Sequence, residues 1–233
     1  MTPCNERRHL RLVATPCNDY RAGMRTLLLL SAALSAAACT SGRTDTPMVG
    51  GSTTSPLPAD AFFARLHTLC GHAYAGRLGA HDASDLAAFA GTPVMHVREC
   101  SADEIRIPFH VGTNRSRTWV ITRTATGLRL KHEHRHEDGS SDAIDLYGGD
   151  SFGARAGSAR RQEFPADAES KAMFAAAGMD ASIDNVWAIS IDPGRRFVYE
   201  LRRPNRHFSV EFDLGEPVAA PPAPWGAERR TAR

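Results

Sequence analysis

Residues 187–213 read WAISIDPGRRFVYELRRPNRHFSVEFD, and this stretch decides the fold class. Apolar and polar residues alternate in three short segments, which is the period of a β-strand with one buried face. The two breaks, Asp-Pro-Gly at 192–194 and Pro-Asn at 204–205, have the composition of turns. Pairing Leu201 with Phe208, and continuing along both strands, puts the aromatic residues on one face. The sequence therefore predicts an antiparallel meander.

The same alternation recurs upstream of this meander. It predicts further strands at residues 74–78, 94–100, 104–111, 117–124, 128–136, 143–147 and 160–164. Helical spacing of apolar residues predicts one helix over 59–70 and another over 167–177. About ten short strands with one polar face each must close on themselves or stack, in order to hide their edges. We therefore expect a mainly β domain: an antiparallel up-and-down barrel with an N-terminal helix and one helix late in the chain.

The N-terminal region carries the features of an export signal. Residues 24–38 start with Met-Arg, continue as a short apolar run and end in small residues before Cys39. The run is shorter than the ~20 apolar residues that span a bilayer, so it fits a signal peptide. Its end resembles the lipobox of bacterial lipoproteins, with Ala36 where leucine is more usual. We expect lipidation of Cys39; simple cleavage after Ala38 is the alternative.

The remaining segments outside the barrel have their own composition. Residues 1–23 precede the signal and are interpreted as a spurious upstream extension. Residues 39–58 are rich in Ser, Thr, Gly and Pro, which predicts a flexible tether. Residues 216–233 are rich in proline, which predicts an extended, disordered tail. The folded domain is therefore expected to span residues 59–215.

Processing of the signal changes the charge and the cysteine count. The whole chain has a formal net charge of +2, but removal of residues 1–38 leaves 23 Lys and Arg against 24 Asp and Glu. A nucleic-acid partner, which a basic chain would favour, is therefore not expected. Once Cys39 is lipidated, Cys70 and Cys100 remain as a pair. In an exported domain such a pair predicts a disulfide, with two free thiols as the alternative.

Histidines continue the apolar face of the strand predicted at 128–136. Pairing Arg123 with Leu128 across the preceding hairpin brings an arginine and a tryptophan onto the histidine face. On the other side of this strand, pairing His136 with Ile144 places His134 opposite Leu146. The predicted ligand-binding residues are Arg117, Trp119, His132, His134 and His136.

Two of these histidines also suggest a metal site. His132 and His134 share one strand face and could supply two ligands for a divalent metal, with a third ligand from another strand. One ion cannot bind all three histidines, because three alternate strand positions span ~13 Å. The alternative is a polar barrel mouth in which the histidines are hydrogen-bonded to Asp138, Asp142 or the backbone.

The stretch after the first predicted helix carries a resemblance. Residues 70–77 read Cys-Gly-His-Ala-Tyr-Ala-Gly-Arg and lead into the meander. This order resembles the entrance to calycin-type barrels, such as lipocalins and fatty-acid-binding proteins, although Tyr74 stands where tryptophan is usual. Residues 127–149, with His-Glu-His-Arg-His-Glu-Asp-Gly and Tyr-Gly-Gly-Asp, resemble a group of bacterial secreted proteins of unknown function. The calycin resemblance implies a ligand cavity but no particular ligand.

These observations favour a non-enzymatic protein of the bacterial cell envelope. A lipid on Cys39 would anchor it to a membrane, facing the periplasm; without the lipid it would be secreted. The barrel would bind a small-molecule or lipid-like ligand, with the arginine and histidine wall at its mouth. Two alternatives stay open. One is a metal-binding protein or metal-dependent enzyme using His132, His134 and His136, and the other is an envelope scaffold for protein partners.

Overall fold

The computed structural model describes the chain over two ranges, residues 57–151 and 157–228. It contains the predicted meander as three antiparallel strands, β9 (Val186–Asp192), β10 (Arg196–Arg203) and β11 (Arg206–Val218). Leu201 lies opposite Phe208, and Phe197 lies opposite Phe212, so the predicted register is confirmed. The three phenylalanines are buried, as expected for the inward face of the sheet.

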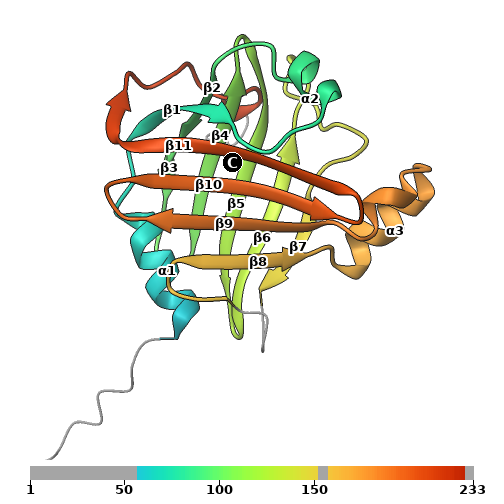
Figure 1. The fold of residues 1–233 in the computed structure, drawn as a ribbon, viewed down its shortest axis with the longest axis horizontal. Coiled ribbons are helices and arrows are strands. Elements are labelled where there is room, and N and C mark those ends of the chain that lie inside the picture. The colour runs from blue at the N-terminus through green and yellow to red at the C-terminus, as the bar shows by residue number, and fades with distance from the viewer. Residues whose placement is uncertain (1–56, 152–156, 229–233) are drawn as a thin grey trace, which may run out of the picture. The chain divides into compact units, whose positions relative to one another are not determined.

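Eight further strands complete one antiparallel sheet. They are β1 (Ala73–Leu78), β2 (Pro93–His96), β3 (Glu99–Cys100), β4 (Glu104–Val111), β5 (Asn114–Thr124), β6 (Gly127–His134), β7 (Tyr147–Ser151) and β8 (Arg161–Pro165). The strand order is β7-β6-β5-β4-β2-β1-β11-β10-β9-β8, with β3 beside β4. In Figure 1, strands β8 to β11 cross in front of strands β4 to β7. The predicted antiparallel up-and-down barrel is confirmed, with 11 strands in the sheet.

The barrel nearly closes where its edge strands β7 and β8 meet. Ser151 Oγ donates a hydrogen bond to Gln162 Oε1 across this seam over 2.8 Å, and both residues are fully buried. A Cβ atom at Gly149 would lie 1.7 Å from the carbonyl oxygen of Pro165. Only glycine allows the two backbones to approach this closely. The close approach leaves little of either edge strand open to water.

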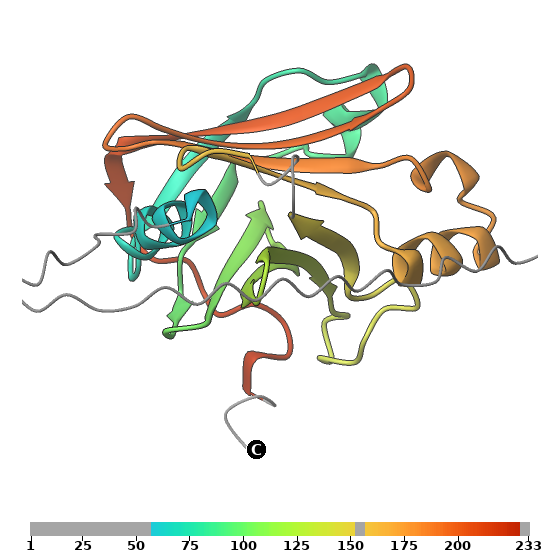
Figure 2. The ribbon, with the colours of Figure 1, turned by 90° about the horizontal axis from the view of Figure 1, so that it is seen from below.

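Among residues 57–151 and 157–228, three α-helices accompany the sheet, namely α1 (Pro58–His67), α2 (Ala83–Ala88) and α3 (Ala168–Ala176). The first and third correspond to the two predicted helices, whereas the six-residue α2 was not predicted. α1 begins with Pro58 at its first turn, where the missing N–H is not needed, and packs against β6, β8 and β9. Figure 2 shows α1 and α3 at opposite ends of the barrel. Within the described ranges, no helix has both the length and the apolar character needed to cross a membrane.

The inward side chains fill one part of the barrel and line a cavity in another. In α1 and the three strands it packs against, β6, β8 and β9, the fully buried side chains include Phe62, Leu66, Leu130, Phe164 and Ile189. Strands of the same sheet contribute ring side chains that line the cavity described below, and these are Phe109, Trp119, His132, Trp187, Tyr199 and Phe208. The α1 end is therefore packed like an ordinary core. The site described below lies at the opposite end.

The segment after β6 differs from its prediction. β6 ends at His134, and the next strand begins at Tyr147 instead of residue 143. Leu146 has a φ of 56°, in the left-handed region, so the chain turns there. As a result His132 pairs with Tyr147, one residue away from the predicted register. A one-residue shift exchanges the two faces of a strand, which turns Tyr147 inward and leaves Leu146 45% exposed.

The residues after 215 differ from the predicted disordered tail. β11 continues to Val218 along β1. Farther on, the backbone N–H of Trp225 donates to the carbonyl oxygen of Arg115 over 3.1 Å, and Ala227 is buried. The prolines of this segment restrict its backbone before it docks, which lowers the entropy lost on packing. The predicted signal peptide and lipidation site lie outside the described residues.

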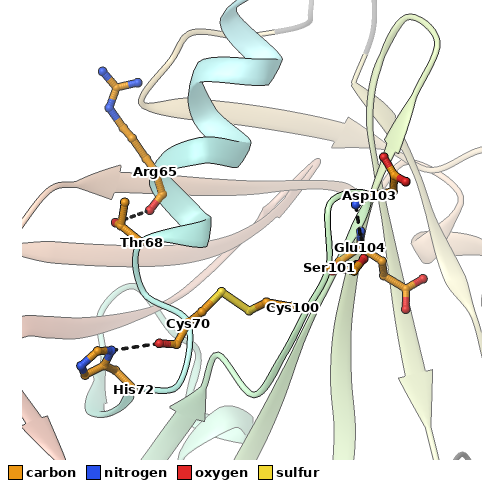
Figure 3. Close-up of a disulfide and its surroundings, with 8 residues drawn as sticks. All are labelled: Arg65, Thr68, Cys70, His72, Cys100, Ser101, Asp103 and Glu104. Atoms are coloured by element: carbon orange, nitrogen blue, oxygen red, sulfur yellow. Dashed lines mark hydrogen bonds between the residues drawn. A yellow bond between two sulfur atoms is a disulfide. The ribbon is translucent and has the colours of Figure 1, made fainter.

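The predicted disulfide is present. Cys70, which follows α1, is bonded to Cys100 of β3, and 30 positions separate the two cysteines. Figure 3 shows this bond joining the turn after α1 to the β3–β4 hairpin, where the backbone N–H of Glu104 donates to Ser101 Oγ over 2.9 Å. The disulfide therefore ties the helix at the filled end of the barrel to the sheet.

Candidate functional site

The end of the barrel opposite α1 contains a cavity of about 380 Å³. Aromatic side chains form a large part of its wall, namely Phe89, Phe109, Trp119, Tyr147, Phe174, Trp187, Tyr199 and Phe208. Five charged side chains also line it, namely Asp85, Arg117, Asp142, Arg203 and Arg206. A concave, mainly apolar site of roughly 300–1,000 Å³ with a few polar groups is typical of small-molecule binding.

Four of the five predicted ligand-binding residues line this cavity, namely Arg117, Trp119, His132 and His134. The hairpin register that joins them is the predicted one, with Trp119 opposite His132 and Arg117 opposite His134. The fifth residue, His136, is exposed and lies beyond the end of β6. It does not share the cavity wall, because the strand stops before it.

Trp119 lies at the centre of a stack of rings. Its ring centroid is 4.4 Å from that of Tyr199 and 4.8 Å from that of Phe109, with interplanar angles of 17° and 14°. Phe89 and Phe208 form another contact in the wall, with centroids 4.8 Å apart. Each side chain is held by its neighbours in a defined orientation. The cavity therefore has rigid, flat aromatic surfaces.

His132 is hydrogen-bonded through both ring nitrogens. Nδ1 lies 3.1 Å from the backbone carbonyl oxygen of Tyr147, which can only accept, so this contact assigns the proton to Nδ1. Nε2 then accepts from the Tyr199 hydroxyl over 2.8 Å. Burial lowers the pKa of His132 to about 3 and raises the pKa of Tyr199 well above its ordinary value. At neutral pH the pair is therefore uncharged.

His134 and Tyr147 form a second pair beside it. Tyr147 Oη lies 3.1 Å from His134 Nε2. Burial lowers the pKa of His134, and the nearby Arg117 guanidinium lowers it further. Burial raises the pKa of Tyr147 to about 12, so its hydroxyl keeps its proton. Tyr147 was not among the predicted site residues, because the predicted register placed Leu146 opposite the histidines.

Arg117 differs from the other arginines of the cavity. Arg206 pairs with Asp85 at 2.6 Å, and Arg203 donates to Ser182 Oγ over 3.1 Å. The Nη1 atom of Arg117 is buried and has no hydrogen-bond partner among residues 57–151 and 157–228. A buried guanidinium nitrogen without an acceptor is costly, so this donor is open to a ligand.

The donor arrangement does not favour the metal hypothesis. In the described ranges, no cluster of three or more His, Cys, Asp or Glu could hold a metal ion. Nε2 of His132 is hydrogen-bonded to Tyr199, and Nε2 of His134 is hydrogen-bonded to Tyr147. A metal at either nitrogen would first have to displace a tyrosine. The histidines belong to a hydrogen-bonded wall, in which their side-chain partners are tyrosines instead of the aspartates considered from sequence.

No protein-family model, curated protein or solved structure matches this chain. The resemblance to calycins therefore rests on the barrel-like sheet alone. The function has to be inferred from the residues of the cavity.

Proposed function

We propose that the barrel domain is a non-enzymatic binding protein for a small, largely apolar molecule. The observation that carries this proposal is the cavity of about 380 Å³ with aromatic walls. The core beside α1 is filled by fully buried side chains, among them Phe62, Leu66 and Phe164. Aromatic surface next to an unfilled space lacks dispersion contacts that a bound molecule would supply. The ligand therefore occupies the α3 end of the barrel.

The polar groups of the wall support binding instead of catalysis. A general base needs a pKa near the working pH and a nitrogen or oxygen that can reach the substrate's proton. His132 has a pKa of about 3, and both of its ring nitrogens are in hydrogen bonds. The hydroxyl of Tyr199 is buried and protonated. These groups orient the rings of the wall and are not poised for proton transfer.

A neutral fluorescent probe tests the cavity directly. We expect N-phenyl-1-naphthylamine, which brightens in apolar surroundings, to bind saturably with one probe per chain. The Ile144→Trp variant should weaken this binding ~10-fold or more, because the larger ring would occupy cavity volume. A tenfold change in Kd corresponds to only ~1.4 kcal/mol of binding free energy. Titration of the purified domain with the probe measures both affinities.

A matched control lies two positions away. Leu146 is 45% exposed and does not line the cavity, so Leu146→Trp should bind the probe as the natural chain does. Circular dichroism of each variant checks that the barrel is folded. An absence of saturable brightening in the natural chain, or equal affinities for the two tryptophan variants, would overturn the proposal.

We also propose that a lipid on Cys39 anchors this domain in the bacterial cell envelope, facing the periplasm. The support is the export signal at residues 24–38 together with the Cys70–Cys100 disulfide, which suits an oxidising compartment. Expressed in a bacterium with labelled palmitate, the natural chain should carry the label and sediment with membranes. The Cys39→Ser variant should lose both properties, whereas Cys70→Ser should keep the label. Equal labelling of Cys39→Ser and the natural chain would reject the anchor.

A further inference from the structure

We propose that the ligand is an aromatic carboxylate and that Arg117 binds its carboxylate group. This inference rests on the proposed binding function and names the chemical class of the ligand. It starts from the one buried guanidinium nitrogen in the cavity wall that has no acceptor within the described residues. An anionic ligand would supply that acceptor.

The contacts of the charged residues around the cavity leave Arg117 available to an anionic group. Arg206 is held by two carboxylates, Asp85 at 2.6 Å and Asp82 at 2.9 Å. Of the other charged lining residues, Arg117 and Arg203 are cationic and Asp142 is anionic. The Asp142 Oδ1 atom accepts from a backbone N–H over 2.9 Å, so it is held in place by the protein itself. Arg203 donates to Ser182 Oγ over 3.1 Å, so Arg117 is the lining arginine for which the described residues supply no hydrogen-bond acceptor at Nη1.

The position of Arg117 favours a carboxylate at the edge of the aromatic surface. A guanidinium presents parallel N–H groups that match the two oxygens of a carboxylate. Across the β5–β6 hairpin, Arg117 lies opposite His134, whose pKa is lowered and which therefore brings no competing positive charge at neutral pH. The nearest hydroxyl to that histidine, Tyr147 Oη, is protonated and brings no negative charge.

The surfaces next to Arg117 favour a flat ring system over a flexible chain. The guanidinium carbon of Arg117 lies 5.9 Å from the ring centre of Phe89, which in turn contacts Phe208. Trp119 lies on β5, as Arg117 does, and its ring is stacked nearly parallel to the rings of Phe109 and Tyr199. Offset or edge contacts with these rigid rings stabilise a planar partner beyond the burial of its area. A planar body attached to the bound carboxylate would lie against these rings.

Competition with the neutral probe tests this inference. The competitors are 2-naphthoate, its uncharged analogue 2-naphthamide, and decanoate as a non-aromatic carboxylate. We expect 2-naphthoate to displace N-phenyl-1-naphthylamine at concentrations ~10- to 100-fold lower than 2-naphthamide, the range for one charge-assisted hydrogen-bonded pair. It should also displace the probe at lower concentrations than decanoate does.

Two variants assign the preference to Arg117. Arg117→Met should lose the preference for 2-naphthoate over 2-naphthamide, with each competitor measured against the probe affinity of that same variant. Circular dichroism of this variant checks that the barrel is folded. Arg129→Met is the control for charge, since Arg129 is exposed and pairs with Asp150 at 2.7 Å, and it should keep the preference.

The outcomes separate the two proposals. If the probe does not bind the natural chain, the proposed binding function fails. If the probe binds but 2-naphthoate and 2-naphthamide compete equally, or if Arg117→Met keeps the preference, the carboxylate inference is overturned while the cavity proposal stands. If decanoate competes better than 2-naphthoate, the aromatic part of the inference is overturned.

Discussion

Acidification should lower the free energy of unfolding of the domain steeply. Each buried histidine whose pKa is strongly lowered should contribute up to ~1.4 kcal/mol per pH unit. Two histidines carry this expectation. Burial lowers the pKa of His132 to about 3, and burial together with the nearby Arg115 lowers the pKa of His110 to about 4. His110 is 3% exposed, and its Nε2 atom has no hydrogen-bond partner in the described part of the chain.

The direction of the effect follows from where each state binds protons. In the unfolded chain these imidazoles titrate near their ordinary pKa of 6.5. Above pH 6.5 both states are neutral, and the stability contributed by the buried neutral rings is fully present. Between pH 6.5 and the folded-state pKa, the unfolded chain binds protons that the folded chain refuses. The free energy of unfolding therefore falls as the pH falls through this window.

Urea unfolding at pH 7.0, 6.0, 5.0 and 4.5 measures this slope. The His132→Gln variant keeps a hydrogen-bonding side chain but cannot titrate, so its stability should fall less steeply by ~1.4 kcal/mol per pH unit below pH 6. The exposed His136 is the matched control, and His136→Gln should retain the natural slope. Parallel slopes for His132→Gln and the natural chain would contradict the buried neutral state of His132.

Strand registers could be predicted from the sequence where a short turn joins two alternating segments. Arg123 lies opposite Leu128 as predicted, since a two-residue connection leaves few ways to pair β5 with β6. Continuing this register along the two strands correctly placed Arg117 opposite His134 and Trp119 opposite His132. The twelve residues between β6 and β7 allow many pairings, and the left-handed turn at Leu146 has no glycine to reveal it. That turn is why Tyr147 was missed.

The properties that make the site interpretable depend on residues far apart in the sequence. The Nη1 atom of Arg117 has no partner within the described part of the chain, and this can be recognised only when the partners of the neighbouring arginines are known. One of those partners, Asp85, is 121 positions away from Arg206. The short helix α2, which carries Asp85, has no room for a helical period and was not predicted. The strand pattern therefore predicted which residues meet in the barrel, but not which of their charges remain unpaired.

Loss of the Cys70–Cys100 disulfide should lower the free energy of unfolding by ~3–4 kcal/mol, the loop-entropy value for a closed loop of about this length. The bond joins the turn after α1 to the β3–β4 hairpin, so its removal frees the N-terminal helix in the unfolded chain (Figure 3). The double variant Cys70→Ala/Cys100→Ala should unfold at a lower urea concentration than the natural chain. Reduction of the natural chain with dithiothreitol should produce the same shift, whereas the double variant should not respond to it.

The same variant separates stability from binding. The disulfide lies just after the end of α1 (Figure 3), and neither cysteine lines the cavity. In the absence of urea, the double variant should therefore bind N-phenyl-1-naphthylamine with the affinity of the natural chain. A lower unfolding midpoint with unchanged probe affinity is expected if the filled end sets stability and the hollow end sets recognition. A loss of probe binding in folded double variant would show instead that the two ends are coupled through the strands that they share.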